Sequence, residues 1–108
     1  MDALNLNLNL ALPFFAGAFL CNSLPHLFAG LQGRKFPTPF SRPATIGYSS
    51  AFTNMLWGIF NAVIGLLLLD RAPVSIGLNA GFVSAMLGAA GLGAYVAVHF
   101  GKVTAGGR

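Results

Sequence analysis

Charged side chains are scarce in this sequence. Asp, Glu, Lys and Arg together make up 7% of its 108 residues, whereas an ordinary soluble domain carries about 25%. Hydrophobic residues make up 56% of the chain, and its mean hydropathy is +0.73. This balance excludes a soluble globular domain, a disordered tail and a nucleic-acid-binding module. What remains is an integral membrane protein that forms a single transmembrane domain over residues 1–108.

Carboxylates and thiols are scarcer still. The sequence has no glutamate and two aspartates, Asp2 and Asp70, so a site with paired carboxylates would require those two residues to meet. The single cysteine, Cys21, excludes an intrachain disulfide and is typical of a small buried hydrophobic residue. The only histidines, His26 and His99, fall at different depths in the membrane. We therefore expect no catalytic residue, no metal site and no cofactor, and we do not expect an enzyme.

Three hydrophobic segments are long enough to cross a membrane as helices, which requires about 20 residues each. They cover approximately residues 12–31, 50–69 and 74–100. Pro13 suits the first turn of the first helix, and Ser49 or Ser50 suits the N-cap of the second. Residues 4–10 alternate Leu and Asn with a period of two, so we expect an extended or irregular segment there. The sequence thus predicts an all-α membrane protein with three transmembrane helices.

Basic residues are distributed unevenly between the two sides of these helices. The loop 32–49 and the C-terminus share one side and carry five of the six Lys and Arg residues, whereas the tight turn 70–73 carries Arg71. Because positively charged loops remain in the cytoplasm, we expect the N-terminus outside and the C-terminus inside.

The loop 32–49 contains three prolines within seven residues, which disfavour a helix. Its cations and phenylalanines suit contact with anionic lipid headgroups at the membrane interface. These expected interface residues are Arg34, Lys35, Phe36, Phe40 and Arg42. Alternatively, the loop is a docking element or gate that Phe36 and Phe40 pack beneath the helices.

Polar residues within the spans recur at helical spacing. In the first span Asn22, His26 and Gly30 lie four residues apart, and Pro25 should kink the helix because it removes a backbone donor. In the second span one stripe contains Ser50, Asn54, Gly58, Asn61 and Gly65. We expect the spans to share a polar cluster in the cytoplasmic half of the membrane, with Tyr95 at its mouth. Its other members are Asn22, Ser23, His26, Asn54, Trp57 and Asn61.

This cluster has two interpretations at this point. The first is structural, because Asn and His side chains that pair across helices fix the packing, at about 1 kcal/mol for each bond. The second is a site for ligand binding or translocation with His26 as its titratable member, because ionisable residues inside a membrane mark functional sites.

Small residues form a seam along the third span. Gly77, Gly81, Ser84, Gly88 and Gly91 follow one another at steps of three or four residues, which allows helix backbones to approach closely. A second row of small residues runs beside it. We therefore expect this helix to pack on two sides, once within the chain and once against a second copy.

Three motifs resemble a known family when they are taken together. They are Asn22-Ser23-Leu24-Pro25-His26, then Phe36-Pro37-Thr38-Pro39-Phe40, and then Ser49-Ser50 followed by Asn54, Trp57-Gly58 and Asn61. This set resembles a family of small, uncharacterised bacterial inner-membrane proteins of about this length. The resemblance implies a helical protein of the bacterial inner membrane, and it implies no activity.

A unit of three spans has too little bulk to enclose a pathway alone. The sequence therefore predicts a small homo-oligomeric membrane protein that serves as a transporter or channel subunit. Its site would be the Asn and His cluster, with His26 as a pH-sensitive or proton-linked group. The alternative is a non-catalytic accessory subunit of a larger membrane complex.

Overall fold

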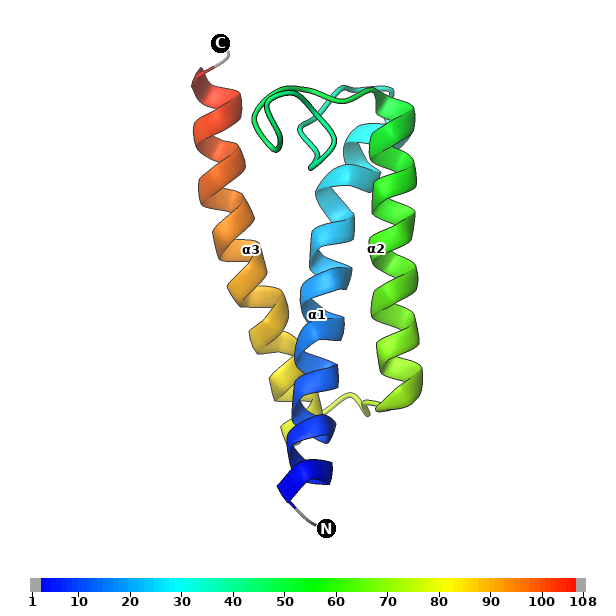
Figure 1. Ribbon diagram of the computed structural model, residues 1–108. Coiled ribbons are helices and arrows are strands. Elements are labelled where there is room, and N and C mark those ends of the chain that lie inside the picture. Colours follow the sequence, from blue (N-terminus) through cyan, green and yellow to red (C-terminus); the bar gives the residue numbers. More distant parts are fainter. Residues whose placement is uncertain (1–2, 107–108) are drawn as a thin grey trace.

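The computed structural model describes residues 3–106, which form three helices in a bundle 51 Å long. The helices are α1 (Ala3–Leu31), α2 (Ala51–Arg71) and α3 (Ala80–Gly106) (Figure 1). Each contains a segment that is long and apolar enough to cross a membrane, namely Asn7–Leu31, Ala51–Arg71 and Ala80–Ala105. The prediction of an all-α chain with three such helices is confirmed, and these helices are those of a multi-pass membrane protein.

The N-terminal segment differs from the prediction. Residues 4–10 belong to α1 and are not extended, and Pro13 lies buried inside the helix instead of in its first turn. An extended segment would leave its backbone groups unpaired in an apolar setting, whereas a helix satisfies them within the segment. Ser84 of α3 supports this part of α1, because its hydroxyl donates to the carbonyl of Leu10 at 2.6 Å.

The third helix begins six residues later than predicted, at Ala80 instead of Val74. Asn79 caps it, with its side-chain oxygen accepting from the backbone N–H of Phe82 at 2.9 Å. Gly77 precedes the cap with a φ of +150°, which a helix does not allow. The predicted tight turn over residues 70–73 is therefore a longer connection from Ala72 to Asn79. At the other end of α2, Ser50 is the N-cap and accepts from the N–H of Thr53 at 3.1 Å.

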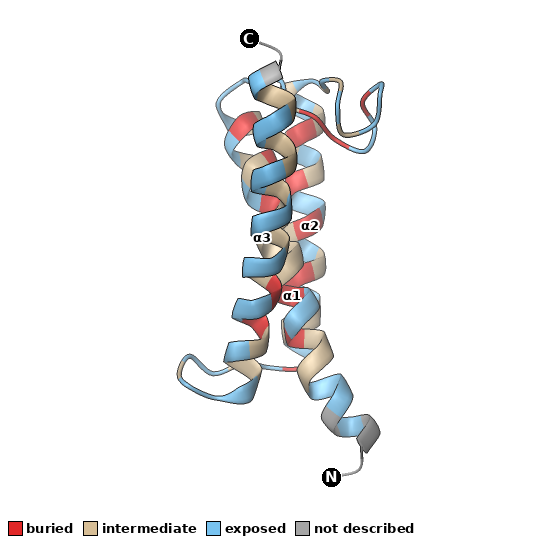
Figure 2. Cartoon of the chain, turned by 90° about the vertical axis from the view of Figure 1, so that its left-hand side faces the viewer, coloured by how far each residue is buried: buried red, intermediate tan, exposed pale blue. Residues whose placement is uncertain are grey.

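Helix α1 is the centre of the bundle. Helices α2 and α3 each pack against α1, and none of their described Cα atoms lie within 8 Å of each other. The buried residues lie on the faces where the helices meet α1, in the loop between α1 and α2, and at Ala72 directly after α2 (Figure 2). On α2 this face is the predicted stripe, with Asn54, Gly58, Asn61 and Gly65 all buried. The arrangement leaves space between α2 and α3.

Helices α1 and α3 touch backbone to backbone at two glycines. A Cβ built on Gly88 would lie 1.9 Å from the carbonyl oxygen of Phe14, and one built on Gly17 would lie 1.9 Å from that of Ala85. Of the five residues of the predicted seam, only Ser84 and Gly88 contact α1. Gly77 lies outside the helix, a Cβ on Gly81 would meet only Asn79 and Val74 of its own segment, and one on Gly91 would meet nothing within 4 Å.

Candidate functional site

Two hydrogen-bonded pairs join α1 to α2. The amide nitrogen of Asn22 donates to the side-chain oxygen of Asn61 at 3.0 Å, and Nδ1 of His26 bonds to the side-chain oxygen of Asn54 at 2.8 Å. His26, Asn54 and Asn61 are almost fully buried, each with at most 2% of its surface exposed. The structure thus brings together four of the predicted pathway residues, on the two stripes that the sequence pattern placed on facing sides of their helices.

Asn61 and Asn54 differ in their remaining partners. Asn61 donates to the backbone carbonyl of Trp57, one turn away on its own helix, at 2.7 Å. Asn54 donates to the carbonyl of Phe36 at 2.9 Å and to that of Ser50 at 3.0 Å. Asn54 therefore ties α2 to the loop as well as to His26.

Ser23 takes no part in either pair. It is buried, and its hydroxyl donates at 2.6 Å to the carbonyl of Leu20 on its own helix. A serine held in this way has no base to remove its proton. No three His, Cys, Asp or Glu side chains gather into a metal site within residues 3–106.

The loop between α1 and α2 folds back over the end of the bundle (Figure 1). Phe36 and Ser49 pair through their backbones, with N–H to carbonyl distances of 3.2 and 2.9 Å. Thr38 is fully buried, and its carbonyl accepts from the N–H of Thr45 at 2.8 Å. Nε2 of His99, on α3, lies 2.8 Å from the carbonyl of Thr45. The loop therefore spans from α2 to α3 and is held at both sides; we refer to residues 36–49 as the lid.

Phe36 is the first residue of the lid, and its ring points inward toward the helices. Its ring centroid is 5.7 Å from that of His26 and 4.7 Å from that of Phe100. Its backbone pairing with Ser49 turns the ring toward His26, yet Phe36 is only half-buried, and its contact with lipid headgroups stays a prediction. Arg34, Lys35 and Arg42 are exposed.

Phe40 is exposed over 64% of its surface, yet its ring packs edge-on against Trp57 at 5.2 Å. The second interpretation of the loop, as an element packed onto the helices by its phenylalanines, agrees with these contacts.

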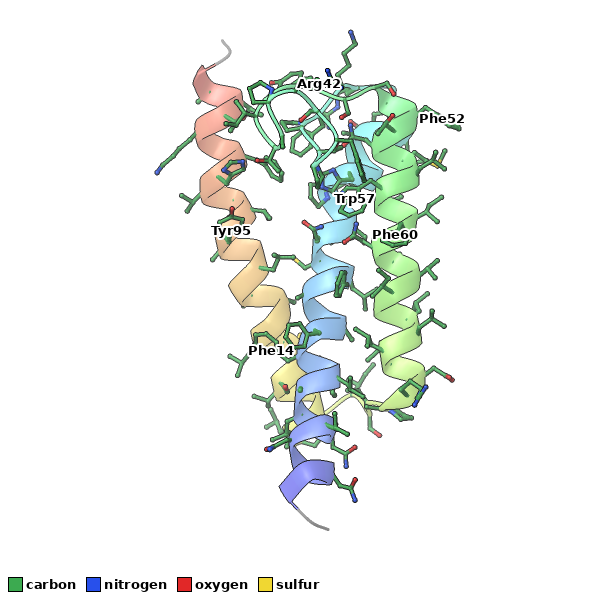
Figure 3. The ribbon with its side chains drawn as sticks, viewed as in Figure 1. Phe14, Arg42, Phe52, Trp57, Phe60 and Tyr95 are labelled. Atoms are coloured by element: carbon green, nitrogen blue, oxygen red, sulfur yellow. The ribbon has the colours of Figure 1, made fainter. Side chains whose placement is uncertain are left out.

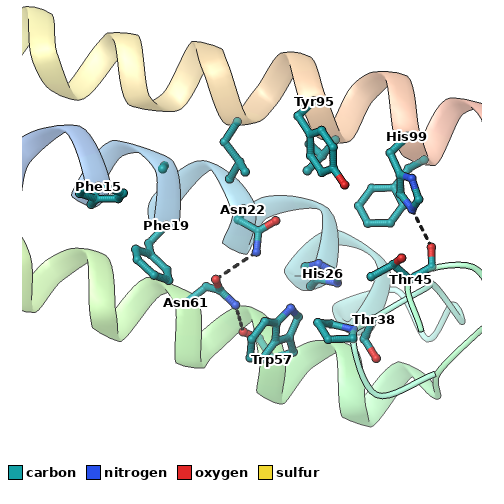
Figure 4. A pocket seen from close by; sticks show the side chains of 15 residues that line it. Phe15, Phe19, Asn22, His26, Thr38, Thr45, Trp57, Asn61, Tyr95 and His99 are labelled. Carbon is teal, nitrogen blue, oxygen red and sulfur yellow. Dashed lines mark hydrogen bonds between the residues drawn. The ribbon is translucent and has the colours of Figure 1, made fainter. Parts of the chain in front are cut away.

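A cavity of about 340 Å³ lies between α2 and α3, in front of α1 and under the lid (Figure 4). This volume is within the range of small-molecule sites, about 300–1,000 Å³. Its walls are mostly apolar, and its polar side chains are few. The polar and aromatic residues around it include Asn22, His26, Thr38, Trp57, Asn61, Tyr95 and His99.

The aromatic surroundings of His26 come from three parts of the chain. Phe36 of the lid, Trp57 of α2 and Phe100 of α3 place their rings edge-on to the imidazole, with centroids 5.7, 6.4 and 6.0 Å away. This shell separates the imidazole from bulk water and leaves the cavity as its open side.

Tyr95 lines the cavity, but it makes no hydrogen bond to the Asn and His pairs, and its place at the mouth of a pathway stays a prediction. Its ring is 65% exposed and stacks on that of His99 with centroids 6.0 Å apart. Figure 3 shows it on α3, across the space from Trp57.

Several residues of this site were not predicted. His99, Thr45, Thr38 and Phe100 all line the cavity, and the His99–Thr45 bond joins residues 54 positions apart. A pattern within one helix contains no signal for such a contact. Comparison of the chain with family models, with curated proteins and with solved structures found no match.

Proposed function

We propose that this protein is a small membrane transporter or channel subunit whose substrate contacts the cavity between α2 and α3. The observation that carries the proposal is the cavity itself, which has polar side chains at mid-membrane depth. Asn61 is the central residue of α2 (Ala51–Arg71), about 15 Å from either end at 1.5 Å per residue. Polar residues at this depth are costly unless they pair or serve a pathway.

An oligomer is part of the proposal. One chain has two helices packed on a third and an open side between them, so it does not enclose a pathway. The outer face of α3 supports association with a second copy, because a Cβ on Gly91 would meet nothing within 4 Å. Small residues on such a face allow close contact between helices in a membrane.

A second candidate function is a non-catalytic accessory subunit of a larger complex. The observation in its favour is that the polar pairs are satisfied within one chain. No buried side-chain nitrogen or oxygen among the described residues lacks a hydrogen-bond partner, as a role in packing requires.

Proton flux into proteoliposomes separates these two functions. We expect His26→Ala to reduce flux, measured with an enclosed pH-sensitive dye, to the level of protein-free vesicles. Asn79→Ala, which alters an exposed asparagine outside the cavity, should retain the flux of the unaltered protein. Native mass spectrometry should show both variants in the same homo-oligomer. Unchanged flux in His26→Ala would overturn the assignment of His26. Flux from the unaltered protein no greater than from protein-free vesicles, or a single copy bound to larger proteins, would favour the accessory role.

We further propose that the chain lies in a bacterial inner membrane, in contact with anionic headgroups. Its N-terminus is outside and its C-terminus is in the cytoplasm. We also propose that Pro25 bends α1. The lid end of the bundle carries Arg34, Lys35, Arg42 and Lys102, whereas Arg71 ends α2 at the other end (Figures 1 and 3). Positively charged ends remain in the cytoplasm. Pro25 lies inside α1 and has no N–H to donate to Cys21.

Cysteine labelling tests this orientation. In a Cys21→Ala background, Leu78→Cys lies in the connection between α2 and α3, where Leu78 is 99% exposed. We expect a membrane-impermeant maleimide to label it in intact spheroplasts, and to label Arg42→Cys only after lysis. Labelling in the reverse order would invert the proposed topology.

A further inference from the structure

The side-chain amide of Asn54 has only one orientation that its surroundings allow. The atom that faces the carbonyls of Phe36 and Ser50, at 2.9 and 3.0 Å, must be the nitrogen, because a carbonyl cannot donate. The oxygen of Asn54 therefore faces His26 and accepts from it at 2.8 Å. It follows that Nδ1 of His26 carries a proton.

This assignment leaves the other imidazole nitrogen as an acceptor. In a neutral imidazole one nitrogen donates and the other accepts, so Nε2 of His26 presents a lone pair. Nε2 makes no hydrogen bond to the described residues. Because every fully buried side-chain nitrogen in residues 3–106 has a partner, Nε2 is not fully buried. Nε2 therefore retains access to the cavity that His26 lines.

The second pair is oriented in the same way. The nitrogen of Asn61 donates to the carbonyl of Trp57 at 2.7 Å, so its oxygen accepts from the nitrogen of Asn22. The oxygen of Asn22 is then left over, and Figure 4 shows it turned away from Asn61 on the cavity side. The backbone carbonyls of Phe36, Ser50 and Trp57 thus direct two acceptors, one from each pair, into one cavity.

We infer that the cavity binds a small, uncharged molecule with an apolar body and one hydroxyl group, which donates to Asn22 or His26. The indole N–H of Trp57, which bonds to no described residue and lies in the cavity wall, is placed to donate to the same hydroxyl. No Asp, Lys or Arg lines the cavity, so it has no permanently charged side chain to pair with a charged ligand. The inference rests on the proposed function in that it takes the cavity to be the substrate site.

The apolar walls of the cavity indicate what the rest of the ligand is like. Phe15, Phe19, Leu92 and Val96 line the cavity away from the lid. The cavity lies between two helices that do not touch, at the depth of the membrane core. A molecule dissolved in the bilayer can therefore enter from the side, with its hydroxyl at the lid end and its apolar part toward Phe15.

The single tryptophan of the chain makes this testable, because Trp57 lines the cavity and bromine quenches indole emission on contact. The probes are 2-bromoundecan-1-ol and its methyl ether, whose bromine lies beside the oxygen that faces Trp57; each is added to the purified full-length protein at equal mole fraction in the detergent micelle. The ether has the same body but no donor. We expect the ether to require about tenfold more ligand for half-maximal quenching, because it has no proton to donate to either acceptor.

Two variants test whether the preference for the alcohol over the ether depends on the acceptor Asn22. Asn22→Leu should reduce the difference between alcohol and ether, whereas Asn79→Ala, outside the cavity, should keep it. Equal quenching by the two probes in the unaltered protein would overturn the inference, and so would no quenching by either. Equal quenching would leave the transport proposal standing, since flux in proteoliposomes is measured separately. A retained preference for the alcohol without flux would overturn transport alone.

Discussion

Gly88→Val is expected to separate α3 from α1. The Cβ of any residue at this position would lie 1.9 Å from the carbonyl oxygen of Phe14 and 2.7 Å from its carbon, whereas ordinary contact begins at 3.4 Å. The obstacle is backbone, so no side-chain rotation relieves it. Either α3 moves outward or both helices distort, which costs about 1–3 kcal/mol for an overpacked core and more where backbone must shift.

The displacement should extend along α3. Ser84 lies one turn before Gly88 and would lose its bond to the carbonyl of Leu10, which is 2.6 Å long. Gly93 lies close to Cys21, with its Cβ position 3.3 Å from the sulfur atom. The reactivity of Cys21, the only thiol in the chain, therefore reports directly on the separation of α1 and α3.

The measurement is the rate of Cys21 modification by a thiol dye, made on the monomer in detergent, so that the outer face of α3 takes no part in the result. Gly91→Val is the matched control, because it places the same side chain on the same helix where nothing lies within 4 Å. We expect at least tenfold faster labelling in Gly88→Val and no change in Gly91→Val, consistent with a loss of about 1.4 kcal/mol or more. Equal rates in the two variants would show that α3 does not pack on α1 through Gly88.

Gly88 and Gly91 show which part of the helix packing the sequence could predict and which part it could not. Helical spacing placed Gly88 and Gly91 on one seam, and only Gly88 meets α1. The crossing angle of two helices decides which part of a seam is used, and that angle depends on packing along the whole contact. The stripe on α2 was predicted correctly because α2 packs on α1 along its length, from Gly65 beside Leu20 to Gly58 beside Leu27.

The two polar pairs could be predicted from helical spacing, as the stripe on α2 could. Asn22 and His26 on one stripe, and Asn54 and Asn61 on another, lie four and seven residues apart, so helices that bring one pair together also bring the other. Residues 4–10 misled the prediction because a period of two indicates a strand only where a partner strand exists. Nothing in the spacing of the loop placed Phe36 on His26 or Thr45 on His99, since those contacts depend on where the lid folds back.

Asn54→Leu is expected to release the lid and His26 together. Asn54 is fully buried and bonds to His26, Phe36 and Ser50 at 2.8, 2.9 and 3.0 Å. Leucine has a similar volume but neither donates nor accepts, so it leaves Nδ1 of His26 without a partner under the lid and leaves the carbonyl of Phe36 with the N–H of Ser49 alone. A buried polar group left unpaired costs about 1–3 kcal/mol, and we expect a loss of that size from Nδ1 of His26.

Trypsin can follow the release because Lys35 directly precedes Phe36. In the unaltered protein the backbone of Phe36 is paired with Ser49, and its carbonyl also accepts from Asn54, so cleavage after Lys35 should be slow. We expect Asn54→Leu to accelerate this cleavage at least tenfold. The matched control is Asn79→Ala, which removes an exposed cap of α3 and should cost about 1 kcal/mol without changing cleavage. Equal cleavage in the two variants would mean that the lid is held by Thr38, Thr45 and His99, and that Asn54 serves His26 alone.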